Sequence, residues 1–196
     1  MAAATRRILI DGPAGKIECV VDEPESSRGV ALVAHPHPLF GGTLDNKVAQ
    51  TLARAFVELG YTAWRPNFRG VGRSEGSYDE GRGELEDLAA VAEYAKSEKP
   101  VLAGFSFGAA VQTRLAQRIK PERMALVGVA VKHFEAPPVP ADTIVIHGEV
   151  DSTVLLADVL AWARPQELPV VVVPGADHFF HRRLHILRSI IQGSWK

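Results

Sequence analysis

The sequence has 196 residues and a formal net charge of −1, with an isoelectric point of about 6.7, and a length of this order predicts a single domain over residues 1–196. The balanced charge does not indicate the excess of basic residues that is typical of proteins that bind nucleic acid or an anionic membrane. We therefore expect a small-molecule partner. The single cysteine, Cys19, cannot form a disulfide within the chain and no run of 18 apolar residues occurs, which favours a cytoplasmic protein.

The first half of the chain predicts strands that alternate with helices. Two strands form a hairpin around residues 11–15, and further strands and helices follow in turn. The predicted segments are strands 6–10, 16–22, 29–34 and 61–66 and helices 46–59 and 84–96. The glycine-rich stretches 12–16 and 67–76 lack the spacing of a Walker loop and of a dinucleotide fingerprint, so no nucleotide cofactor is expected.

The second half continues the alternation. It predicts strands 99–103, 124–131, 143–147 and 170–173 and helices 109–118, 154–163 and 179–192. Strands separated by helices of this length form a mostly parallel sheet that is covered by helices on both faces. Ligands bind at the carboxyl ends of such strands, so we expect the functional residues to lie there.

A nucleophile motif lies between a predicted strand and a predicted helix. The sequence Gly104-Phe105-Ser106-Phe107-Gly108 fits the G-x-S-x-G pattern, in which a serine stands on a sharp strand-to-helix turn. The turn crowds the positions two before and two after the serine, where glycine fits. The Phe107 amide then points to where an oxyanion would form, at the favourable end of the helix dipole. The alternative is a serine that only caps the helix.

A serine nucleophile needs a base, and the base needs an anionic side chain to fix its tautomer. Candidates for both follow later strands. The segment 147–151 ends in Asp151, and the segment 174–178 ends in His178. The chain order Ser106, Asp151, His178 is that of α/β-hydrolases, so we predict these three residues as a catalytic triad. Glu149 is the rival acid, and Asp151 and Asp177 could each be a turn or helix cap instead.

The second oxyanion donor should come from the loop 35–43, which begins His35-Pro36-His37-Pro38-Leu39. The prolines have no amide hydrogen, which leaves the backbone N–H groups of His37 and Leu39 as equal candidates. The pair His35 and His37, and a second pair, His181 and His185, each lack a third metal ligand. We therefore expect no metal.

Five motifs in order resemble those of the small bacterial α/β-hydrolases of the dienelactone-hydrolase-like branch, which lack a lid. They are residues 35–43, 67–74, 104–108, 147–151 and 176–178. The resemblance implies an α/β-hydrolase fold and a carboxyl-ester hydrolase with Ser106, Asp151 and His178 at the catalytic positions. Dienelactone hydrolases proper have a cysteine nucleophile where this chain has serine, so the resemblance supplies no substrate.

The expected enzyme cleaves carboxylic esters through an acyl-enzyme, without a cofactor. Residues 132–142, between two predicted strands, are too few for a lid, so the site should be open. Apolar side chains near the catalytic positions favour short acyl groups; they are Leu39, Phe40, Phe105, Phe107, Phe179 and Phe180. The alternatives are a thioesterase, an amidase or peptidase with the same triad, and a non-catalytic binding protein on this fold. No feature marks a subunit interface.

Overall fold

Eight strands form one sheet, in the order β1-β2-β4-β3-β5-β6-β7-β8. The computed structural model describes residues 4–195. The strands are β1 (Ala4–Gly12), β2 (Gly15–Glu23), β3 (Gly29–Ala34), β4 (Tyr61–Pro66), β5 (Val101–Phe105), β6 (Met124–Val127), β7 (Ile144–Gly148) and β8 (Val170–Val173). The β1–β2 and β2–β4 pairs are antiparallel and all other pairs are parallel. The predicted mostly parallel sheet with an N-terminal antiparallel hairpin is therefore confirmed.

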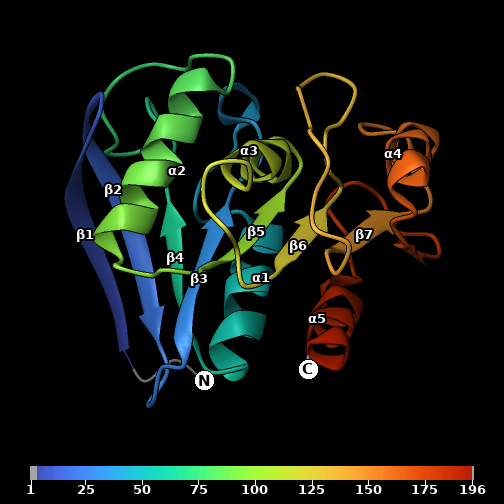
Figure 1. Ribbon diagram of the computed structural model, residues 1–196, viewed down its shortest axis with the longest axis horizontal. Coiled ribbons are helices and arrows are strands. Elements are labelled where there is room, and N and C mark those ends of the chain that lie inside the picture. The colour runs from blue at the N-terminus through green and yellow to red at the C-terminus, as the bar shows by residue number, and fades with distance from the viewer. Residues whose placement is uncertain (1–3, 196) are drawn as a thin grey trace.

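Helices cover both faces of the sheet (Figure 1). They are α1 (Lys47–Glu58), α2 (Arg82–Tyr94), α3 (Phe107–Leu115), α4 (Leu156–Ala163) and α5 (Leu184–Ser194), with short 3-10 turns η1 (Pro38–Phe40) and η2 (Arg164–Gln166). One apolar cluster joins α2, α3 and α4 to one face, and a second joins α1 and α5 to the other. Among residues 4–195, none of the helices combines the length and the apolar character needed to cross a membrane.

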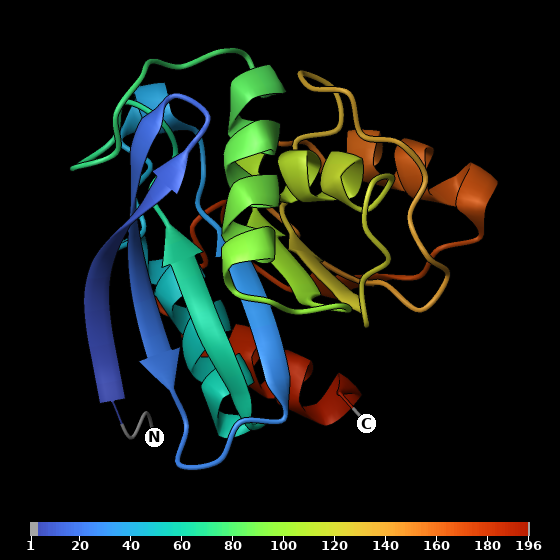
Figure 2. The same ribbon diagram turned by 60° about the vertical axis from the view of Figure 1, so that its left-hand side comes forward.

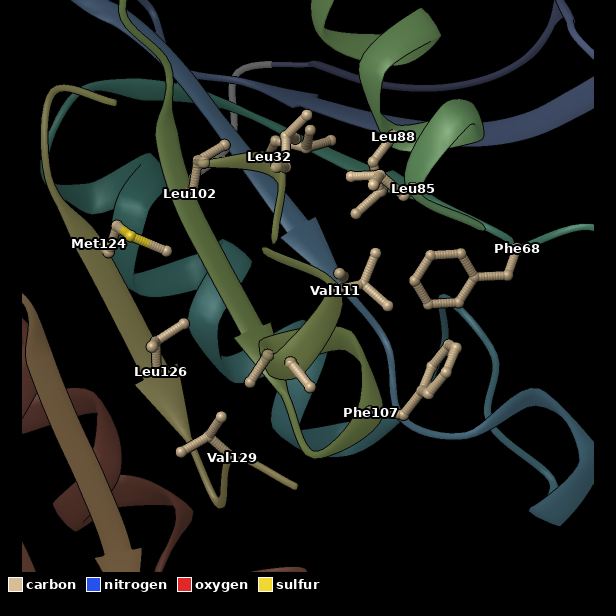
Figure 3. Packing of buried hydrophobic residues seen from close by; sticks show 14 of the residues in the cluster. Leu32, Phe68, Leu85, Leu88, Leu102, Phe107, Val111, Met124, Leu126 and Val129 are labelled. Atoms are coloured by element: carbon tan, nitrogen blue, oxygen red, sulfur yellow. The ribbon is translucent and has the colours of Figure 1, made fainter. Parts of the chain in front are cut away.

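The two apolar clusters follow from the alternation of side chains along each buried strand. In β3, Leu32 packs with the α2 and α3 cluster, whereas Ala31 and Val33 pack with the α1 and α5 cluster. Figure 3 shows Leu32 beside Leu102 of β5, and it shows Leu85 and Leu88 of α2, which belong to the same cluster. Figure 2 shows α2 lying across this face of the sheet. The core is thus two layers, one on each side of the central strands.

Several element bounds differ from the predicted ones for identifiable reasons. Strand β6 stops at Val127 rather than 131, because Gly128 turns the chain with φ +52°. The last helix begins at Leu184 rather than 179, because Phe180 and Arg182 have positive φ values that a right-handed helix excludes. Strand β5 extends through Phe105 and helix α3 begins at Phe107, so the strand-to-helix turn is a single residue.

Glycine permits the close approach of α3 to the sheet. A Cβ atom on Gly108 would stand 2.4 Å from the carbonyl oxygen of His35 and 2.6 Å from the carbonyl carbon of Ala34. One on Gly104 would stand 2.7 Å from the amide nitrogen of Ala109. These neighbours are backbone atoms, which cannot rotate away as a flexible side chain can. The position of α3 against β3 and β5 therefore depends on both glycines.

We expect Gly108→Ala to lower the free energy of unfolding by about 3 kcal/mol or more, because the added methyl group overlaps the β3 backbone. Urea denaturation measures it. The matched control is Gly193→Ala in the exposed part of α5, where a Cβ meets nothing within 4 Å. There the same substitution should stabilise by about 0.5–1 kcal/mol through helix propensity. Equal effects at the two positions would contradict the close approach.

Candidate active site

Ser106 occupies the whole of the turn between β5 and α3. Its backbone has φ +56° and ψ −116°, a sparsely populated conformation for a residue with a side chain. Such a conformation costs about 1–3 kcal/mol and persists only where the surroundings impose it. Here the Ser106 N–H donates to the Val127 carbonyl at 2.9 Å, and the Ser106 carbonyl accepts from the Ala110 N–H at 3.2 Å. The turn thus places Ser106 directly beyond the carboxyl end of β5.

The structure brings Ser106, His178 and Asp151 together in one hydrogen-bonded chain. His178 Nδ1 lies 2.6 Å from Asp151 Oδ2, and His178 Nε2 lies 3.1 Å from Ser106 Oγ. An ionised carboxylate only accepts, so Nδ1 carries the proton and Nε2 presents its lone pair to the serine hydroxyl. All three residues are largely buried, at 5–7 % exposure. The arrangement can therefore take a proton from Ser106.

Asp151 is held by backbone donors of its own loop. Its Oδ1 accepts from the N–H groups of Thr153 and Val154, at 2.9 and 2.8 Å. Two backbone bonds tie this loop to the one that carries His178, since the N–H of Glu149 donates to Val173 and that of Val150 to Ala176. These two hydrogen bonds connect the start of the loop after β7 with the end of β8 and the loop that follows it.

His147 is a neighbour of Asp151 that sequence reasoning did not single out. It is fully buried, its Nε2 donates to the Val154 carbonyl at 2.9 Å, and the same nitrogen lies 3.6 Å from Asp151 Oδ2. Burial lowers the pKa of His147, so the ring stays neutral. The only sequence signal was its place at the start of the segment 147–151, which shows neither its burial nor the direction of its ring.

The rival acid, Glu149, and the neighbouring Asp177 have other partners. The Glu149 carboxylate accepts from the Gly175 N–H at 2.7 Å, and the Asp177 carboxylate lies 2.6 Å from His181 Nδ1. The hydrogen bond from His181 lowers the pKa of Asp177. Within residues 4–195, Asp151 supplies the carboxylate that is hydrogen-bonded to His178.

A small cavity of about 90 Å³ opens at Ser106 and His178. Its other lining residues are Pro36, His37, Phe40, Gly41, Gly42, Asn46, Thr153 and Phe179. Phe40 and Phe179 are exposed, whereas Phe105, Phe107 and Phe180 are fully buried in the core. Of the six apolar residues expected near the catalytic positions, only Phe40 and Phe179 therefore line this cavity.

The two candidate oxyanion residues of the loop 35–43 have different surroundings. The Leu39 N–H donates to His37 Nδ1 at 3.2 Å, and the Leu39 side chain is 64 % exposed outside the lining of the cavity. His37 lines the cavity. The Phe107 amide is at the first position of α3, where an N–H has no partner within the helix. The amide of Phe107 is therefore available to a ligand.

The two histidine pairs have other roles. His35 is fully buried, with Nδ1 donating to the Pro36 carbonyl at 2.7 Å and Nε2 accepting from the Phe68 N–H at 3.0 Å. Burial lowers the pKa of His35 to about 4. His181 precedes α5 and pairs with Asp177, whereas His185 lies on α5. In the described part of the chain, no group of three His, Cys, Asp or Glu side chains could hold a metal ion.

The fold, the serine turn and the order of the three polar residues define the class of α/β-hydrolases. The chain belongs to the α/β-hydrolase family, whose model matches residues 31–142. It is 33% identical to an uncharacterized protein of Rickettsia prowazekii, over 89% of this chain and 82% of the relative.

Two solved structures have the same fold along nearly their whole length. One is an α/β serine hydrolase without a lid from Xanthomonas campestris, with 36% identity, a TM-score of 0.91, and coverage of 99% of this chain and 94% of that one. The other is an α/β serine hydrolase homologue from Coxiella burnetii, with 37% identity, a TM-score of 0.90, and coverage of 100% and 99%. The expected bacterial lidless hydrolase family is confirmed.

The low pKa of His35 predicts how stability depends on pH. Between about pH 6.5 and pH 4 the unfolded chain protonates this ring while the folded chain keeps it neutral, so acid favours unfolding. This group alone should lower the free energy of unfolding by up to about 3 kcal/mol across that window. Urea denaturation at several pH values measures the slope.

The variant His35→Gln keeps an acceptor for the Phe68 N–H but does not titrate, so its stability should fall less steeply than that of the wild type. His185→Gln, on the exposed surface, is the control and should show the wild-type slope. A wild-type slope in His35→Gln would show that this ring is not the group responsible.

Proposed function

We propose that the protein is a serine esterase that cleaves small or short-acyl carboxylic esters through an acyl-enzyme. The observation that carries the proposal is the continuous chain from Asp151 through His178 to Ser106, with contacts of 2.6 and 3.1 Å. Ser106 lies on a strained turn at the carboxyl end of β5, beside a cavity that is open to solvent. This is the geometry that nucleophilic catalysis requires.

In the proposed first half-reaction, Ser106 Oγ attacks the acyl carbon while His178 Nε2 takes the hydroxyl proton. Asp151 accepts from His178 Nδ1–H and stabilises the imidazolium that forms. His178 then returns the proton to the leaving alcohol. In the second half-reaction, water attacks the acyl-serine with His178 again as the base, which releases the acid and restores Ser106.

The oxyanion of the tetrahedral intermediate would accept from two backbone amides. One is that of Phe107, at the N-terminus of α3, where the helix dipole also favours negative charge. We assign the second to His37 rather than Leu39, because His37 lines the cavity and the Leu39 N–H already donates to the His37 ring. Each such donor contributes about 10²–10³ in rate in subtilisin.

An activated serine should react with a fluorophosphonate, because the serine oxygen attacks the phosphorus atom of the reagent as it would attack an acyl carbon. We expect intact-protein mass spectrometry to show one adduct, on Ser106. Ser106→Ala should abolish the adduct and lower ester kcat by up to about 10⁶. Asp151→Asn should retain the fold but lower kcat by about 10⁴, through loss of the correct tautomer of His178.

Ser189→Ala, on the exposed side of α5, is the matched control and should label like the wild type. A folded wild-type protein that forms no adduct would contradict the proposal and favour a binding protein on a hydrolase fold. Parallel assays with an acyl-CoA thioester and an aminoacyl anilide separate esterase from thioesterase and amidase activity.

Substrate size should follow the dimensions of the cavity. Its volume of about 90 Å³ is far below the roughly 300 Å³ or more of pockets for drug-sized ligands. We expect kcat/KM for p-nitrophenyl esters of uncharged straight-chain acids to be highest for acetate and butyrate and to fall for octanoate and longer chains. An increase of kcat/KM with chain length would contradict the short-acyl preference.

A further inference from the structure

A second, larger cavity of about 580 Å³ adjoins the aromatic cluster beside the catalytic serine. Tyr78 and Phe134 line this cavity, and both rings pack against His37, at centroid distances of 4.9 and 5.6 Å. His37 in turn lines the cavity at Ser106. The two cavities therefore have the His37 ring and its aromatic neighbours as a common wall. A substrate long enough to reach past this wall from Ser106 would enter the larger cavity.

Arg114 brings a positive charge without a partner into the larger cavity. It lies on α3, eight residues beyond Ser106, and its side chain is half-buried. Its Nη1 would be 3.1 Å from a Cβ on Gly81, so the guanidinium lies against the first turn of α2 and beside the Phe107 ring. Among the bonds and ion pairs of residues 4–195, none involves the Arg114 guanidinium. By contrast, half-buried Arg69 is paired with Asp87, and half-buried Arg188 is paired with Glu58.

Tyr78 adds a hydrogen-bond donor to the same cavity. Because His37 Nδ1 accepts from the Leu39 N–H, the proton of the neutral ring is on Nε2, which lies 3.1 Å from the Tyr78 hydroxyl oxygen. Burial lowers the pKa of His37, which keeps the ring neutral. The Tyr78 oxygen therefore accepts this bond, and its own hydrogen remains free for a ligand.

The acidic side chains that line the cavity leave Arg114 available. The Glu80 carboxylate forms an ion pair with Arg82, at 2.9 Å. Glu135 is exposed, so solvent and salt screen its charge. A guanidinium and a hydroxyl donor, both without acceptors, match a carboxylate, which accepts two parallel bonds from arginine.

We propose that this cavity binds a carboxylate carried by the ester substrate, with Arg114 as the cation and Tyr78 as a second donor. The inference rests on the proposed esterase function and deepens it, since it names esters with an anionic acyl group as the substrate class. Eight residues of helix span about 12 Å, and helical side chains lean toward the N-terminus. The carboxylate therefore binds within about 12 Å of Ser106, a span that the half-esters of dicarboxylic acids can cover.

The test compares two matched series of substrates. One series is the p-nitrophenyl half-esters of succinic to suberic acid, and the other is the same compounds with the free carboxylate capped as its methyl ester. In the wild type we expect kcat/KM to be at least about tenfold higher for the anionic member of the best pair, because charged hydrogen bonds are the stronger ones. The ratio should decline toward one as NaCl is raised from 10 to 500 mM.

Arg114→Gln should reduce that ratio by about tenfold, and Tyr78→Phe should reduce it by a smaller factor. Arg118→Gln is the matched control, because Arg118 is exposed and paired with Glu86 outside the cavity. It should leave the ratio unchanged. A wild-type ratio near one, or an unchanged ratio in Arg114→Gln, would overturn the carboxylate site.

The outcomes separate this proposal from the one on which it rests. If the wild type hydrolyses the capped esters but shows no preference for the free carboxylate, the subsite is wrong and the esterase function stands. If it hydrolyses neither series and forms no fluorophosphonate adduct, the esterase function itself is wrong. The salt dependence of the wild-type ratio keeps the test decisive even if Arg114→Gln fails to fold.

Discussion

The single-residue turn at Ser106 is the constraint on which the rest of the site depends. A strand and a helix meet there without a connecting loop, which forces a positive φ on a residue that has a side chain. The turn exists only because α3 can lie directly on the backbone of β3 and β5, where Gly104 and Gly108 have no Cβ atoms. That approach also brings the first amide of α3 next to the loop after β3. One steric condition thus places Ser106 and the first amide of α3, that of Phe107, together.

The electrostatics of the site follow from burial. A buried carboxylate is costly unless hydrogen bonds satisfy it, and Asp151 accepts from two backbone amides as well as from His178. His35 and His147, which are also buried, stay neutral because desolvation penalises the charged ring. They act as neutral hydrogen-bonding spacers that hold the surrounding loops. Within the site, the carboxylate of Asp151 therefore lies behind the ring of His178, on the side away from Ser106.

The aromatic cluster around His37 is built from segments that lie far apart in sequence. Its ring packs against Phe40, Tyr78, Phe107 and Phe134, which come from four different segments of the chain. The segment 128–143, between β6 and β7, contains no helix or strand and contributes Phe134 to this cluster. Under the proposed function, this aromatic cluster and the loop after β3 would shape the path of a substrate to Ser106. The proposed chemistry and the proposed choice of substrate thus depend on different parts of the fold.

The sequence by itself determined the alternating order of strands and helices, the nucleophile turn and the loops that carry Asp151 and His178, because these depend on local periodicity and on positions just after strands. It left Asp151 and Glu149, and His37 and Leu39, as paired alternatives, and it missed His147, Tyr78 and Arg114. Tertiary structure decided which carboxylate lies against His178, which of His37 and Leu39 lines the cavity at Ser106, and that Arg114 lines the larger cavity. The physical reason is that a side chain's partners come from segments tens of residues away, whose approach no local pattern encodes.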